Sequence, residues 1–308
     1  MTKTIALIAA GAVLVCAAAF MLLRDSKHPK AADQPRRILV TTSFYPLFFF
    51  AQGIGGDRAE VINITPAGAE PHDYEPTAND IALIESSSLL ILNGGGLEAW
   101  GRNIKKNIDP QHTTVIVAAE GLISLLVNDE GKSASDPHVW LSPPLAEQMV
   151  GRITQGFIQV DGTAREYYRL NANVLKAKLQ ELDTAFKKGL AVCRTRTIIT
   201  SHAAFGYLAS AYGLKQISIA GLSPDAEPSP RQLMKIAKFA TDNQVRFIFF
   251  ESLASPKLSQ TIAREIGAET LVLNPLEGLS NTDLAMGKNF LTEMQNNLTN
   301  LKRALQCT

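Results

Sequence analysis

The sequence predicts an α/β protein with two lobes, each with a mainly parallel sheet flanked by helices, joined by one long backbone helix. Short runs of β-branched and apolar residues alternate with helical segments in both halves of the chain, which is typical of parallel sheets. Between the halves, residues 163–190 carry apolar side chains at helical spacing. A helix of that length spans about 40 Å and can connect two lobes, whereas a helix lying across one sheet is the alternative.

The length of 308 residues suggests about two domains, at roughly 100–200 residues per domain. We divide the chain into a targeting or anchor segment over 1–24, a linker over 25–36, an N-terminal lobe over 37–162, the linking helix over 163–190 and a C-terminal lobe over 191–308.

The first half is expected to contain strands at 38–42, 59–64, 89–92 and 114–117, and helices at 45–51, 78–86, 97–107 and 145–160. Thr77 can cap the second of these helices, because Asp80 stands in its first turn. A polar loop is expected over 124–137.

The second half repeats the pattern. Strands are expected at 197–201, 215–219, 245–250 and 271–273, and helices at 203–212, 231–242, 257–266 and 287–305. Gly267 is placed to end the third helix, since glycine readily adopts the left-handed conformation of a C-cap.

The N-terminus carries an export signal. Residues 5–23 contain no charge, and about 20 apolar residues can span a bilayer. The segment is either a retained anchor or a cleaved signal, and Val13-Leu14-Val15-Cys16 resembles a lipoprotein signal in which Cys16 would be acylated. The usual small residue before that cysteine is replaced by Val15. The remaining chain is therefore expected in the periplasm or at the cell surface, associated with the membrane through its N-terminus.

Charge and cysteine content add two expectations. Lys and Arg number 30 against 29 Asp and Glu, and this balance argues against a nucleic-acid partner. Outside the export segment the cysteines are Cys193 and Cys307. In an oxidising compartment they can form a disulfide, and two unpaired thiols are the alternative.

Three of the five histidines, His72, His138 and His202, stand in loops after apolar runs or prolines. Ligands in parallel-sheet proteins lie beyond the carboxyl ends of the strands, and Glu251 and Asn274 also stand at that position. Three imidazoles and one further ligand suit tetrahedral Zn²⁺, while added carboxylates favour Mn²⁺. The sequence therefore predicts a metal site between two metal-binding lobes, with Glu251, Asn274, Glu70 or a water as fourth ligand.

Over residues 37–306 the chain resembles the zinc- and manganese-binding solute-binding proteins of bacterial ABC importers, the cluster A-I group. Residues 71–77 (PHDYEPT), 136–141 (DPHVWL) and 201–208 (SHAAFGYL) resemble its three histidine loops, the last in the zinc-type form. The family usually has an aspartate near 273–276, where this chain has Asn274, so water or Glu251 is preferred as fourth ligand. The histidine-rich loop of many zinc-type members has no counterpart here, because residues 127–135 contain no histidine.

The resemblance implies a non-enzymatic function: capture of a divalent metal, foremost Zn²⁺, and delivery to an ABC permease and its ATPase by a monomeric binding protein. Two alternatives stay open. One is a manganese-binding protein of the same family. The other is a zinc hydrolase with an activated water and Glu251 as base. The chain lacks the paired-histidine helix motif of metalloproteases, which disfavours the hydrolase.

Overall fold

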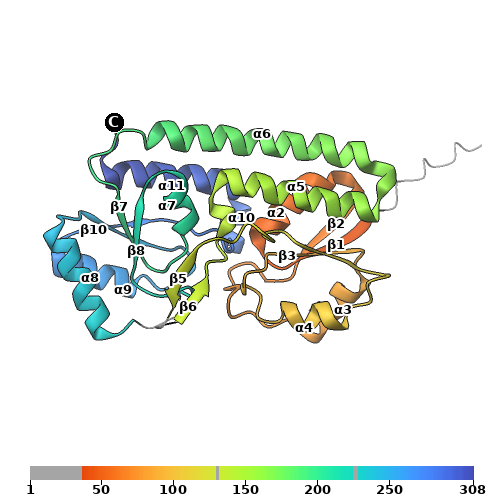
Figure 1. Ribbon diagram of the computed structural model, residues 1–308, viewed down its shortest axis with the longest axis horizontal. Coiled ribbons are helices and arrows are strands. Elements are labelled where there is room, and N and C mark those ends of the chain that lie inside the picture. The colour runs from red at the N-terminus through yellow and green to blue at the C-terminus, as the bar shows by residue number, and fades with distance from the viewer. Residues whose placement is uncertain (1–36, 130–131, 225–227) are drawn as a thin grey trace, which may run out of the picture. The chain divides into compact units, whose positions relative to one another are not determined.

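The computed structural model describes residues 37–308 apart from 130–131 and 225–227, and residues 37–308 form one compact unit (Figure 1). The expected targeting segment, its Cys16 and the linker lie outside the described residues. Within the described part of the chain, no helix is both long and apolar enough to cross a membrane.

The predicted α/β fold with a lobe at each end of a long helix is confirmed (Figure 1). One lobe holds a four-stranded parallel sheet in the order β2-β1-β3-β4. Its strands are β1 (Ile38–Thr42), β2 (Ala59–Asn63), β3 (Leu89–Leu92) and β4 (Thr114–Val117). Its helices are α2 (Tyr45–Gly55), α3 (Ala78–Ser86), α4 (Gly101–Asn107) and α5 (Pro143–Val160), with the short 3-10 helices η1 (Gly56–Arg58) and η2 (Val139–Leu141).

The other lobe has two parallel strand pairs, β7–β8 and β9–β10. These strands are β7 (Thr197–Thr200), β8 (Lys215–Ser218), β9 (Phe247–Phe250) and β10 (Glu269–Val272). The helices of this half are α7 (Gly206–Ala211), α8 (Pro230–Asp242), α9 (Lys257–Ile266), α10 (Asn281–Ala285) and α11 (Phe290–Leu305).

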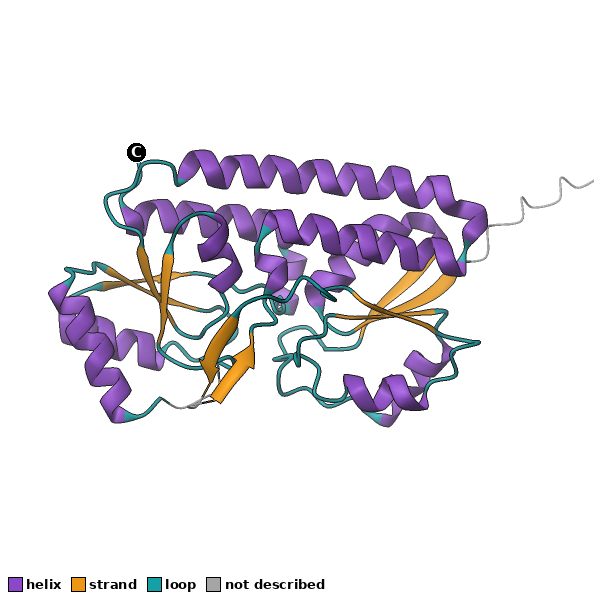
Figure 2. Ribbon diagram, viewed as in Figure 1, coloured by secondary structure: helices purple, strands orange, loops and turns teal. Residues whose placement is uncertain are grey.

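On one side, the strands of both lobes are covered by a layer of helices formed by α2, α5, α6 and α11 (Figure 2). The largest apolar cluster fills the space under this layer and includes Val40 and Trp140 of the first lobe and Ile198 and Leu273 of the second. Smaller clusters lie on the opposite faces, one under α3 and α4 around Ile84, the other under α8 and α9 around Ile248. The two lobes therefore share one core.

The long helix α6 (Arg165–Gly189) follows the 3-10 helix η3 (Gly162–Ala164) and runs along both lobes (Figure 1). Its buried side chains recur every three or four residues: Tyr168, Ala172, Leu175, Leu179, Leu182 and Phe186. Near its start, the Asp161 carboxylate accepts hydrogen bonds from the Thr163 hydroxyl at 2.5 Å and the Tyr168 phenol at 2.8 Å. These bonds fix where the helix begins.

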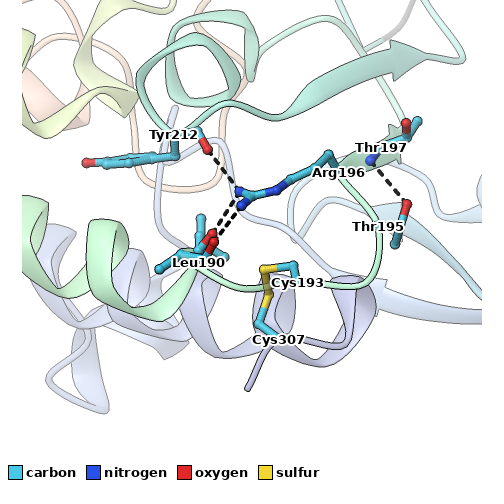
Figure 3. The surroundings of a disulfide bond; sticks show 8 residues. Leu190, Cys193, Thr195, Arg196, Thr197, Tyr212 and Cys307 are labelled. Atoms are coloured by element: carbon cyan, nitrogen blue, oxygen red, sulfur yellow. Dashed lines mark hydrogen bonds between the residues drawn. A yellow bond between two sulfur atoms is a disulfide. The ribbon is translucent and has the colours of Figure 1, made fainter.

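The end of α6 is joined to the C-terminus. Cys193 and Cys307 form a disulfide, one of the two outcomes expected from the sequence (Figure 3). The guanidinium of Arg196 donates to the carbonyl oxygens of Leu190 and Ala191, both at 2.7 Å (Figure 3). A cation at this end also complements the negative end of the helix dipole.

Several segments differ from the sequence prediction: the helix expected at 97–107 begins at Gly101, and α10 was not expected. The loop before His138 contains an antiparallel hairpin of β5 (Leu126–Asp129) and β6 (Lys132–Ser135). The helix after His202 begins only at Gly206, because the Ala203 amide donates to the Gly221 carbonyl, at 2.8 Å, instead of a helical partner. The closing helix begins at Phe290, because Asn289 caps it through the amides of Leu291 and Thr292.

Candidate metal centre

His138 lies in a loop that is held on several sides. Its ring Nδ1 is 2.8 Å from Oδ1 of Asp136, which also accepts the His138 backbone N–H at 3.0 Å. The Asn93 side chain donates to the Pro137 carbonyl at 3.0 Å. The indole of Trp140 donates to the Pro275 carbonyl of the other lobe at 2.8 Å and packs edge-on against Phe44. The imidazole is completely buried, and its Nε2, on the side away from Asp136, lies 3.0 Å from Glu277 Oε1.

His202 stands two residues after β7, as the strand-end rule predicts. Its Nδ1 is 2.6 Å from Oε1 of Glu251, which follows β9 directly. The same carboxylate oxygen accepts the Ser201 hydroxyl. The ring of His202 is also fully buried, so its orientation is set by a carboxylate on a neighbouring strand.

His72 lies in the loop between β2 and α3. The loop contains a turn at residues 71–73, and the phenol of Tyr74 donates to the Asp80 carboxylate at 2.7 Å. The His72 amide donates to the Glu70 carboxylate at 3.2 Å. Its side chain is 10% exposed, whereas those of His138 and His202 are 0% exposed.

Glu277 is a residue that the sequence prediction missed. It lies in the loop after β10, five residues beyond Val272, rather than at the strand end. The amide of Leu276 donates to Asn274 Oδ1 at 2.8 Å, and Leu276 has a left-handed φ of 60°. This turn points the Glu277 carboxylate at the histidines, and the side chain is only 2% exposed. No short motif marks the residue; its place after a tight turn in a Pro-Leu-Glu-Gly loop is the only signal.

Three Nε2 atoms and one carboxylate oxygen converge. Oε1 of Glu277 is 3.0 Å from His138 Nε2, 3.3 Å from His202 Nε2 and 3.4 Å from His72 Nε2. His72 Nε2 and His138 Nε2 are 3.2 Å apart, and all four donor atoms lie within 4.8 Å of one another. Donors at 2.0–2.1 Å around a tetrahedral ion are separated by about 3.3–3.4 Å. The donor spacing therefore fits one zinc-sized ion.

His138, His202 and Glu277 of this cluster shift one another's pKa values toward their charged forms. Burial opposes protonation of His138 and His202, but hydrogen bonds and charge attraction from Asp136, Glu251 and Glu277 raise the pKa of both rings above the usual value. Burial would raise the pKa of Glu277, yet the three histidines hold it well below the ordinary range. A metal ion arriving here replaces protons on the rings, so its binding releases them.

Glu70 lies at the edge of the cluster. Burial, followed by repulsion from the Glu277 carboxylate, raises the pKa of Glu70 to about 9. A neutral carboxyl next to a charged one avoids two close negative charges.

The two other residues expected as ligands lie apart from the four converging donors. Glu251 contacts Nδ1 of His202, on the side of the ring away from Glu277. The Asn274 amide oxygen is used by Leu276, and its amide nitrogen lies 3.5 Å from Glu293. The structure thus brings the three predicted histidines together with Glu277, which the sequence prediction did not name.

The fold and site together define a class: a two-lobed α/β binding protein with three imidazoles and one carboxylate between its lobes. Residues 40–304 match the family model described as ZnuA, the periplasmic component A of the zinc-uptake complex. The chain therefore belongs to this family of solute-binding proteins, as its resemblance to the cluster A-I group implied.

Individual relatives agree with this assignment. The chain is 38% identical to the high-affinity zinc uptake system protein ZnuA of Bacillus subtilis over 95% of this chain and 97% of that protein. Among solved structures it is similar to the metal-dependent lipoprotein YcdH of B. subtilis, with 41% identity and a TM-score of 0.77 over 87% of this chain and 99% of that one. The Zn(II)-bound ZnuA-like domain of Streptococcus pneumoniae AdcA gives 37% identity and a TM-score of 0.77, again over 87% and 99%.

Proposed function

We propose that this protein captures Zn²⁺ outside the cytoplasmic membrane and delivers it to an ABC permease with its ATPase. The observation that carries the proposal is the convergence of His72, His138, His202 and Glu277 at separations suited to one tetrahedral ion. The family to which the chain belongs is a zinc-uptake component, which supports the same cargo.

The donor set favours Zn²⁺ over Mn²⁺. Imidazole suits zinc, whereas manganese prefers carboxylate, carbonyl and water oxygens in octahedral coordination. The site offers three nitrogens and one carboxylate, so Mn²⁺ is the secondary cargo. One carboxylate also reduces the +2 charge of the ion to +1 in a buried site.

From the ligands expected from the sequence we retain His72, His138 and His202. We assign the fourth position to Glu277 in place of Glu251, Asn274, Glu70 or a water. The hydrolase alternative is not favoured. The family is a solute-binding component and not an enzyme. In addition, four protein donors complete tetrahedral coordination and leave no position for the activated water that zinc hydrolases need.

Replacing His138 tests the proposal directly. We expect His138→Ala to lower zinc affinity by several orders of magnitude, because one imidazole is lost from the first coordination shell. Native mass spectrometry and a competition titration with a zinc chelator measure stoichiometry and affinity. The matched control is His112→Ala, since His112 is an exposed histidine outside the cluster. Equal affinity of the two variants would contradict the proposal.

We also propose that the chain functions as a monomer, divided into lobes 37–162 and 191–308 by the helix at 163–190. Residues 1–24 would direct export and attach the protein to the membrane, through residues 5–23 or an acyl chain on Cys16, with 25–36 as linker. A solved relative is named a lipoprotein, which supports the acyl alternative. Mass measurement of the mature N-terminus, with and without globomycin-type inhibition of lipoprotein processing, separates the two.

A further inference from the structure

We propose that Asp136 and Glu251 are positioning residues that hold His138 and His202, together with Glu277, as a preformed three-donor half-site, which His72 completes last on zinc binding and leaves first on release. This inference rests on the zinc site proposed above. It assigns roles to two carboxylates outside the donor cluster and an order to the four donors.

The three imidazole rings are supported unequally. Nδ1 of His138 lies 2.8 Å from Asp136, and Nδ1 of His202 lies 2.6 Å from Glu251. Among the described residues, Nδ1 of His72 has no hydrogen-bond partner. A carboxylate on the second ring nitrogen fixes the tautomer and raises the basicity of a ligating imidazole. Two rings are thus oriented for a metal before it arrives, and the third is not.

The carboxylates of Asp136 and Glu251 are themselves buried. Asp136 is 0% and Glu251 4% exposed, so both act in a medium of low polarity. Asp136 is fixed by its own backbone, because its amide donates to Leu125 and its carbonyl accepts the Tyr207 phenol at 3.1 Å. A Cβ on Gly206 would lie 2.6 Å from Asp136 Oδ2, so glycine is needed there for the carboxylate to lie as it does.

The half-site draws its donors from both lobes, and hydrogen bonds between the lobes connect them. Trp140, two residues after His138, donates to Pro275, two residues before Glu277. Tyr207, which lies close to His202 in the chain, accepts hydrogen bonds from the amides of Ser124 at 2.9 Å and Leu125 at 3.2 Å, ahead of the His138 loop. The donors His138, His202 and Glu277 are therefore connected by direct contacts.

His72 differs from the other three donors in its exposure and support. Its side chain is 10% exposed, the largest exposure of the four donors, and it comes from the loop between β2 and α3. Among the described residues no carboxylate holds Nδ1 of His72, so this ring can turn away from the metal without breaking a hydrogen bond at its second nitrogen. We conclude that zinc enters and leaves on the side of His72.

The experiment compares zinc release from the full-length chain after mixing with a strong chelator in a stopped-flow instrument. Asp136→Asn and Glu251→Gln should each weaken zinc binding about 10–100-fold, the usual effect of losing such a partner. His72→Ala should still bind one zinc per chain but release it much faster, while His138→Ala should bind none under the same conditions. His112→Ala is the control for removing a histidine outside the cluster.

A second readout separates positioning from folding. The Co²⁺ form of each variant is examined by its visible absorption, and circular dichroism checks the fold. Asp136→Asn and Glu251→Gln should shift the tetrahedral Co²⁺ bands with the fold retained, because ring orientation has changed. Zinc bound by Asp136→Asn and Glu251→Gln as tightly as by the wild type would overturn the positioning role. Equal loss of zinc in His72→Ala and His138→Ala would overturn the order. A wild type that binds no zinc would instead refute the proposed function.

Discussion

Glu277 reaches the three imidazoles because the chain turns sharply just before it. Asn274 accepts the Leu276 amide, and Leu276 takes a left-handed conformation that is uncommon for a residue other than glycine. Asn274 is itself held by Asn297, which accepts its amide at 2.8 Å and donates to its carbonyl at 2.7 Å. Asn274 stands near the position where the family usually has its fourth ligand. Here its side chain supports the turn that brings Glu277 to the histidines.

Replacing Glu277 by glutamine should weaken zinc binding by at least about 100-fold. The amide is neutral and a poor zinc ligand, so the ion would lose its anionic donor and keep its full +2 charge in a largely buried site. A competition titration at neutral pH measures the loss, and stoichiometry should remain one zinc per chain at high zinc concentration.

Asn274→Asp is the informative companion to this variant, since it adds a carboxylate at the position expected from the sequence. With its oxygen committed to Leu276, the residue should leave the preference for zinc over manganese unchanged. A shift toward manganese in Asn274→Asp, with unchanged zinc affinity in Glu277→Gln, would return Asn274 to the coordination shell.

At the residue scale, the three histidines could be predicted from the sequence as candidate metal ligands, whereas Glu277 could not. Histidine is rare in this chain, and three in similar loops are informative. The strand-end rule identified Glu251 and Asn274, because a side chain directly after a parallel strand points to the ligand edge. Glu277 lies five residues beyond β10, and only the turn geometry, which the sequence does not reveal, brings it back.

Among the elements, α6 depends on a small polar cluster at its start. Asp161 accepts from Thr163 and Tyr168 and lies 3.4 Å from Arg58 of the first lobe. Burial opposes the charged form, but these partners together lower the pKa of Asp161 below its usual value. The carboxylate therefore stabilises the folded state while it is ionised.

Asp161→Asn should lower the free energy of unfolding by about 1–3 kcal/mol at neutral pH, the range for a hydrogen bond to a charged group. Because the folded pKa is depressed, this stabilisation is present above the unfolded value of about 3.9 and is lost as pH falls through the folded value. Urea unfolding of the zinc-free protein between pH 3 and 7 tests this. A difference between wild type and variant that grows on acidification would contradict it.

The period of apolar residues made α6 predictable, since Tyr168, Leu175, Leu179, Leu182 and Phe186 all lie on one face. The hairpin of β5 and β6 was not predictable by the same means. Its strands have four residues each and pair only with each other, and β6 is polar and largely exposed. The spacing of apolar residues predicts an element only where one of its faces is buried. Short elements without a buried face are therefore not predicted by it.

At the scale of the whole molecule, the disulfide joins the end of α6 to the end of the chain across 114 residues of sequence. A disulfide that closes so long a loop lowers the conformational entropy of the unfolded chain. Replacing both cysteines by serine should lower the free energy of unfolding by about 2–4 kcal/mol. Denaturant titration measures this, with zinc stoichiometry expected to stay unchanged because the bond lies outside the donor cluster. Equal stability of the two proteins would show that the disulfide contributes nothing.

The shared core leads to a prediction about cooperativity. One apolar cluster runs through both lobes and α6, so partial unfolding of either lobe would expose it. The donors likewise come from both lobes. We therefore expect a single thermal transition in the zinc-free protein and a single, higher one with zinc. At a free zinc concentration 1,000 times Kd the added stability is about 4.1 kcal/mol, which raises the melting temperature by several degrees.

Calorimetry of the full-length chain, with a chelator or with excess zinc, checks both parts. His112→Ala should show the same shift as wild type, and His138→Ala should show little. Two separate transitions, with zinc moving only one, would mean that the ion binds one lobe and that the common core does not couple them. One transition that moves as a whole shows that both lobes unfold as one cooperative unit that binds zinc, because a ligand stabilises only the cooperative unit that binds it.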